Sequence, residues 1–196
     1  MHAPAFPKTA DAYSWLKAPR YQNVPYEAGP LARMWINGSY QRGISVMDRH
    51  LARAQEADLL ADAMNSWLDQ LQPTAPVYIP FSTPSNAAGI GLTEAPRGAL
   101  GHWHRITAGK IGRYQIITPT CWNASPRDSV GTPGPMEQAL LGTPVDNPNE
   151  PVEVVRVIHS FDPCLSCAVH VMRPGEGARV YPIPDSKFEV RNWDTK

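Results

Sequence analysis

The chain has 196 residues, of which 42% are hydrophobic, which fits one globular domain with a real core better than a disordered chain. Its 18 lysines and arginines balance its 18 aspartates and glutamates, so no net charge draws it to nucleic acid or an anionic membrane. Three cysteines do not fit a disulfide framework, and we expect neither a signal peptide nor a transmembrane helix of the chain's own.

The first part of the chain predicts an arm followed by a long helix. Residues 1–42 are rich in proline, glycine and aromatic residues, so we expect an extended arm with a short helical turn near Leu31–Ile36. From about Ser45 to Gln72, good helix formers separate apolar residues at a spacing of about 3.6, which predicts one amphipathic helix that Pro73 ends. The predicted apolar face comprises Leu51, Ala54, Leu59, Ala63, Trp67 and Leu71.

The middle of the chain, residues 73–120, predicts a loop and a hairpin. Residues 73–98 have four prolines before Glu94 and small residues after it, and we expect a compact loop there. The runs ALGHWHRI and IGRYQIITP are rich in aromatic and β-branched residues and flank the turn sequence TAGK. They predict a β-hairpin whose second strand ends at Pro119.

The remaining elements are predicted to be short. Residues 121–150 indicate loop with a short helix around Met136–Leu141, and VEVVRVIHSF predicts a strand that leads into the cysteine segment. The predicted fold class is therefore α+β, with one long helix, a hairpin, much irregular loop and a short cysteine-bearing helix near the C-terminus.

The cysteine segment FDPCLSCAVH carries the clearest chemistry. Asp162 followed by Pro163 predicts the start of a helix, which puts Cys164 in the first turn, where the positive helix end favours a thiolate. Cys167 would share its face, because residues three apart in a helix differ by about 60° in direction. His170 would lie one turn deeper and serve a neighbouring group.

Two other interpretations of this cysteine pair are weaker. A tetrahedral zinc site needs four protein ligands, and the chain has no second C-x-x-C and no H-x-x-x-H. A thioredoxin-like redox pair needs a βαβ unit around it, which the predicted elements near the end of the chain do not supply.

The segment DPCLSCAVH resembles the D-P-C-x-x-C-x-x-H signature of nickel–iron hydrogenase large subunits. Four further blocks look like that family's, in its order and spacing: YSWLKAPRY with EAGPLARM, EAPRGALGHW, YQIITPTCWNASPRD and HSFDPC. The resemblance covers essentially the whole chain and is strongest to uptake-type, respiratory enzymes. It implies the C-terminal part of the large-subunit fold over residues 1–170, with the cysteine motif at 161–170.

The resemblance implies a ligand role for each cysteine of the motif. Cys164 would be a terminal nickel ligand, and Cys167 would bridge nickel to an iron that carries cyanide and carbon monoxide. Soft thiolates suit this chemistry. The family's other two thiolates belong to an N-terminal C-x-x-C that this chain lacks. Cys121 does not replace them, and we expect it to be a small buried hydrophobe.

The resemblance also places catalytic and supporting residues around that centre. Arg97 would lie over the open side of the metal pair, with Asp162 as its partner, although an ion pair that only supports the loop is the alternative. Pro96 and Thr120 would lie beside the diatomic ligands of iron.

A second ion and several histidines complete the expected site. His170 and the Ile116 carbonyl would bind Mg²⁺ or a similar divalent ion, whose carboxylate ligand belongs to a missing segment. We expect Glu94 to support its loop. Three histidines are either proton relays or, more simply, structural residues: His102, His104 and His159.

The resemblance gives the end of the chain a role in maturation. Family precursors lose a C-terminal peptide to a dedicated endopeptidase after nickel insertion, and here the cut would fall between His170 and Val171. Residues 171–196 would then be released, unless they are permanent structure.

The expected function is that of a component of a hydrogenase, catalysing H2 ⇌ 2H⁺ + 2e⁻. Electrons would leave through iron–sulfur clusters on a small subunit, because this chain has too few cysteines to hold a cluster. Activity would require an N-terminal large-subunit segment with the other C-x-x-C, whether the chain is a split subunit, a truncated product or a gene fragment. The alternative is an inactive fragment or non-catalytic interaction remnant. Through its partner, the chain would act on the extracytoplasmic side of the membrane.

Overall fold

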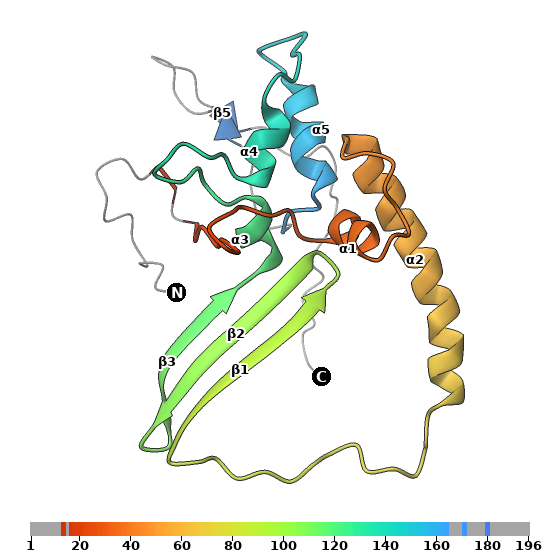
Figure 1. Cartoon of the computed structure of the whole chain (residues 1–196), viewed down its shortest axis with the longest axis vertical. Coiled ribbons are helices and arrows are strands. Elements are labelled where there is room, and N and C mark those ends of the chain that lie inside the picture. The colour runs from red at the N-terminus through yellow and green to blue at the C-terminus, as the bar shows by residue number, and fades with distance from the viewer. Residues whose placement is uncertain (1–12, 15, 165–169, 172–178, 181–196) are drawn as a thin grey trace, which may run out of the picture. The chain divides into compact units, whose positions relative to one another are not determined.

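The computed structural model describes residues 13–14, 16–164, 170–171 and 179–180, and Figure 1 shows its elements. The chain forms two units, Met1–Pro163 and Cys164–Lys196. Besides Cys164, the described part of the second unit is one antiparallel strand pair, β4 (His170–Val171) with β5 (Arg179–Val180). The first unit mixes helices with a three-stranded sheet, in agreement with the predicted α+β class.

Two helices form close to the predicted positions, the first of them inside the predicted arm of residues 1–42. The short helix α1 spans Pro30–Ile36 and has a proline in its first turn, and α2 spans Val46–Asp69. A capping box starts α2: the Asp48 N–H donates to the Ser45 hydroxyl over 3.2 Å, and the Ser45 N–H donates to the Asp48 carboxylate over 2.7 Å. Neither α2 nor any other described helix is both long and apolar enough to cross a membrane.

The predicted apolar face of α2 is wrong. The side chains of Leu51, Leu59 and Trp67 are exposed, whereas the helix buries Arg49 and Ala52. The reason is that only the first half of α2 packs against other described elements, mainly α1 (Figure 1). The two helices approach closely there, and the small side chain of Ala52 fits between them. A small apolar core forms at this contact from Leu31, Met34, Tyr40 and Ala52.

The sheet is an antiparallel meander in the order β1-β2-β3. Strand β1 spans Asn86–Ala95, β2 spans Gly98–Thr107 and β3 spans Lys110–Ile117. The predicted hairpin is confirmed as β2 and β3. Its two-residue turn has Ala108 and Gly109 at φ of 51° and 71°, the positive values that a tight hairpin turn requires.

Strand β1 corrects the prediction of a compact loop over 73–98. The segment that forms it, NAAGIGLTEA, is rich in small residues with low strand propensity. Pairing with all ten residues of β2, from Asn86 opposite Thr107 to Ala95 opposite Gly98, supplies the backbone hydrogen bonds that make it a strand.

Three helices follow the sheet. Helix α3 (Pro119–Asn123) was not predicted, and α4 (Pro135–Leu140) lies where a short helix was expected. Helix α5 (Val152–Ser160) corrects the predicted strand. Its β-branched residues favour a strand, but Val157 and Phe161 are four apart and both buried, so packing on one helical side overrides propensity.

The predicted helix start at Asp162 is not found in residues 162–164, and residues 165–169 of the predicted helix lie outside the described residues. Asp162 has φ 51° and its N–H donates to the His159 carbonyl over 2.9 Å, so it closes α5 in a left-handed conformation that aspartate tolerates. Cys164 lies outside any helix, and His170 lies in strand β4. Cys167 lies outside the described residues.

Candidate functional site

The turn that carries Arg97 joins β1 to β2 and packs backbone to backbone against the start of α1. Gly98 has φ 132°, and a Cβ there would lie 2.7 Å from the Gly29 nitrogen. A Cβ on Gly29, itself at φ 124°, would lie 2.9 Å from the Arg97 carbonyl oxygen. Only glycine permits this approach, which brings EAGP and EAPRG together.

Arg33 on α1 clamps the same turn. Its guanidinium donates to the carbonyls of two successive residues, from Nη1 to Ala95 over 3.1 Å and from Nη2 to Pro96 over 3.0 Å. It also binds both Glu56 carboxylate oxygens over 2.6 Å and one Glu94 oxygen over 2.7 Å. Hydrogen bonding to Glu56 is the main cause that raises the pKa of Arg33. Glu94 thus supports its loop, as predicted.

A second arginine holds the end of α5, next to Asp162. The Arg49 guanidinium lies 3.8 Å from the centre of the buried Phe161 ring and donates to both Glu27 carboxylate oxygens over 2.9 and 2.8 Å. Arg53 donates to the Ser160 carbonyl over 2.8 Å. Helix α2 therefore fixes the residues that precede Asp162.

Arg97 and Asp162 meet as predicted, although they come from segments far apart in the chain. The Arg97 Nε lies 3.3 Å from the Asp162 Oδ2, and the two side chains are 39% and 38% exposed. The Nε atom itself is buried and has no well-oriented hydrogen bond within the described residues. Since its orientation is poor and both side chains are partly solvated, the pair adds little stability. Within the part of the chain that the structure describes, no hydrogen bond engages the Arg97 guanidinium.

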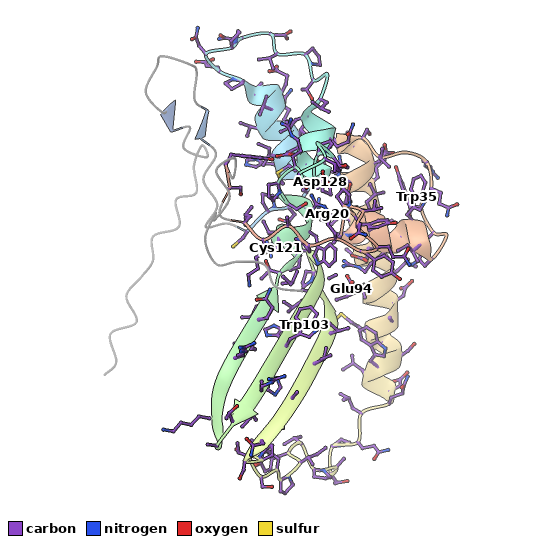
Figure 2. The ribbon with its side chains drawn as sticks, turned by 60° about the vertical axis from the view of Figure 1, so that its left-hand side comes forward. Arg20, Trp35, Glu94, Trp103, Cys121 and Asp128 are labelled. Carbon is purple, nitrogen blue, oxygen red and sulfur yellow. The ribbon has the colours of Figure 1, made fainter. Side chains whose placement is uncertain are left out.

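Helix α3 is docked against the same region. The buried Asn123 side chain accepts from the Ala28 N–H over 2.8 Å and donates to the Ala28 carbonyl over 2.9 Å. Thr120 is half-buried on this helix. Cys121 is also half-buried, rather than buried as predicted, and its sulfur accepts from the Thr118 hydroxyl over 3.2 Å. Figure 2 labels Cys121 on this helix and Glu94 near the end of strand β1.

The Ile116 carbonyl, predicted to bind a divalent ion, accepts a hydrogen bond from Lys17 Nζ over 2.9 Å. The same ammonium donates to the Gln115 side chain over 3.1 Å. Of the three histidines considered as proton relays, His102 hydrogen-bonds Tyr114 over 2.5 Å, which is consistent with a structural role.

The donor chemistry of the motif fits a nickel–iron group in part. Cys164 is exposed and follows Asp162 by two residues, and its thiol is the soft ligand type such a group requires. Among the described residues no three histidine, cysteine or acidic side chains come together as a metal site. Two of the four expected thiolates have no counterpart in the sequence.

Most of the chain matches the model of a known protein family. The family model described as nickel-dependent hydrogenase matches residues 3–44 and 38–170 of the chain. The chain belongs to the nickel-dependent hydrogenase family. Two arginines were not predicted as site residues: Arg33, which lies in the block EAGPLARM, and Arg49, which lies outside the quoted blocks. Their contacts in the fold reveal them.

Several relatives are large subunits of hydrogenases. The periplasmic NiFeSe hydrogenase large subunit of Desulfomicrobium baculatum is 43% identical over 87% of this chain and 38% of its own length. An uptake hydrogenase large subunit from Azotobacter chroococcum mcd 1 is 39% identical over 84% of this chain and 34% of its own. The chain thus spans little more than a third of these relatives.

Solved structures agree with these sequence matches. A reduced, active form of the Ni-Fe-Se hydrogenase from Desulfomicrobium baculatum is 44% identical, with a TM-score of 0.75 over 82% of this chain and 38% of that chain. The Ni-Fe-Se hydrogenase from D. vulgaris Hildenborough, in the reduced state, is 39% identical with the same TM-score. The fold described above is therefore part of the hydrogenase large-subunit fold.

Proposed function

We propose that this chain is a component of a nickel–iron hydrogenase large subunit and supplies half of the thiolates of the metal centre. Cys164 would bind nickel, and Cys167 would bridge nickel and iron. The observation that supports this most directly is the Arg97–Asp162 pair, which brings the two motifs together at 3.3 Å. Arg33 and the glycine contact hold the arginine side of that pair, while Arg49 holds the other.

When bound, a nickel–iron centre with cyanide and carbon monoxide on iron supplies the electron-accepting chemistry of heterolytic H2 cleavage. The role of Arg97 is electrostatic, because a guanidinium stays protonated and is a poor base but stabilises developing negative charge. Asp162 orients that guanidinium. Pro96, in the clamped turn, would give the site an apolar wall, and the Thr120 hydroxyl would donate to a cyanide of that centre.

The remaining parts of the proposal concern assembly. A small subunit would accept the electrons through iron–sulfur clusters and keep the complex on the extracytoplasmic side of the membrane. Nickel-insertion proteins would act first, and an endopeptidase would then cut between His170 and Val171. If His170 and the Ile116 carbonyl bind Mg²⁺, the Lys17 ammonium has to leave that oxygen first.

A non-catalytic remnant is the second candidate. It is favoured by one contact, because the Lys17 ammonium already occupies the Ile116 carbonyl that a divalent ion would bind.

The hydrogenase activity of a reconstituted complex distinguishes a catalytic component from a non-catalytic remnant. The chain would be co-expressed with the unmatched part of the Desulfomicrobium baculatum large subunit and with that enzyme's small subunit, and H2-dependent dye reduction would be measured. We expect activity that Arg97→Lys lowers by at least about a hundredfold, because lysine cannot present the same planar donors. Arg105→Lys, on an exposed strand position, is the matched control. Absence of activity, or equal activity in both variants, contradicts the catalytic proposal.

A further inference from the structure

The second half of α2 presents an apolar stripe to solvent. Leu60, Met64 and Trp67 are four and three residues apart, so they lie on one side of the helix, and they are 48%, 56% and 52% exposed. Leu71, which follows the helix at the same spacing, is also exposed. The opposite side is polar, with Asp58, Asp62, Asn65 and Asp69. We call the four apolar residues Leu60, Met64, Trp67 and Leu71 the α2 stripe.

The α2 stripe continues a side of the helix that is already packed. Counting back at the same spacing gives Glu56, Arg53 and Arg49, the residues that bind α1, the end of α5 and the N-terminal arm. One side of one helix thus packs on the fold in its first half and is exposed in its second. Figure 1 shows the helix running past α1. Such continuity indicates that the stripe is an interior surface of a larger fold.

The segment after α2 extends this apolar surface. It has no regular secondary structure and contains the sequence VYIPF, in which four large side chains are exposed: Val77, Tyr78, Ile79 and Phe81. Contiguous apolar side chains of this kind mark an interaction surface.

The comparisons indicate which partner has the matching surface. The chain retains its fold with a TM-score of 0.75 while it corresponds to only 38% of the Desulfomicrobium baculatum structure. Most of that large-subunit fold therefore has no counterpart here. We propose that the α2 stripe and residues 77–81 form the docking surface for the remaining part of a hydrogenase large subunit. This inference rests on the proposed function, since it names where the partner of the metal site binds.

Binding to a defined probe tests the docking surface. The probe is the unmatched part of the Desulfomicrobium baculatum large subunit, co-expressed as a separate polypeptide with the full chain. We expect a complex in which Met64→Glu with Trp67→Glu weakens association by at least about tenfold, because a buried interface core excludes unpaired charge. Asn65→Glu adds a charge on the polar side and is the matched control.

A second measurement does not depend on any variant. Hydroxyl-radical labelling of Met64 is expected to be strong in the free chain and to fall severalfold in the complex. Absence of a complex, equal binding of all variants, or unchanged labelling of Met64 overturns the docking surface. Self-association of the chain through the same residues also overturns it, because the occupant is then a second copy. A stripe-dependent complex that retains no nickel would support the docking surface and contradict the proposed function.

Discussion

The two halves of α2 differ in what they contact. The first half supports the Arg97–Asp162 site, and the second half carries the proposed docking surface. The first half places Arg49, Arg53 and Glu56 in hydrogen bonds to the arm, α5 and α1. The second half, with Met64 and Trp67, leaves its apolar side exposed. The contacts that hold the Arg97–Asp162 pair therefore come from within this chain, whereas the second half of the helix exposes apolar side chains. Perturbing each half should have unequal effects on the stability of the isolated chain.

The largest effect is expected where the Arg97 turn meets α1. In Gly98→Ala the new Cβ would lie 2.7 Å from the Gly29 nitrogen, at φ 132°, so both strain and a backbone clash destabilise the fold. We expect a loss of about 3 kcal/mol in the free energy of unfolding, measured by urea denaturation. Gly131→Ala is the control, because Gly131 also has positive φ but open space around its Cβ position. Equal losses in the two variants would show that the close approach is unimportant.

The next largest effect is expected at Arg33. Its side chain is 23% exposed and that of Glu56 16%, so Arg33→Ala leaves a mostly buried carboxylate and two turn carbonyls without their donor. We expect a loss of about 2–3 kcal/mol, measured in the same way. Arg105→Ala, on an exposed strand position, should cost less than about 0.5 kcal/mol. A cost for Arg33→Ala as small as that of its control would contradict the clamp.

A smaller effect is expected from pH at the start of α2. The hydrogen bond from Ser45, followed by the one from Tyr40, lowers the pKa of Asp48. A carboxyl whose pKa is lower in the folded state stabilises the fold above its unfolded pKa, and that contribution is lost as the pH falls through the folded pKa. Lowering the pH from neutral to acid should therefore reduce the unfolding free energy of the natural chain more than that of the Asp48→Asn variant, as measured by denaturation at each pH. Parallel pH profiles would mean that the capping box does not act through the charge.

The smallest effect is expected on the second half of the helix. Trp67→Glu should change the unfolding free energy of the isolated chain by less than about 0.5 kcal/mol, because the ring is already 52% exposed. The variant and the natural chain would be compared by thermal unfolding. A loss as large as that of Arg33→Ala would mean that the stripe packs inside the chain.

The sequence predicts local structure well where the cause is local. The long helix has its capping box and helix formers, and the hairpin has its turn, so both could be recognised. The family motifs likewise lie in contiguous blocks. They predict the pairing of Arg97 with Asp162 through the resemblance, although no local pattern connects the two residues.

The wrong predictions concern elements whose structure depends on contacts between residues far apart in the chain. Strand β1 depends on pairing with β2, and α5 depends on burial of Val157 and Phe161, so propensity alone gives the wrong answer. Asp162 looks like a helix start but ends the preceding helix. The clamp by Arg33 is recognisable only when α1 and the β1–β2 turn are brought together.

The most direct test of the central claim is the nickel content of the purified complex with the unmatched part of the Desulfomicrobium baculatum large subunit. We predict nickel in equimolar amount to the chain, lost in Cys164→Ser and retained in Cys121→Ser. A complex without nickel, or nickel that survives Cys164→Ser, would contradict the proposal that this chain provides half of a nickel–iron centre.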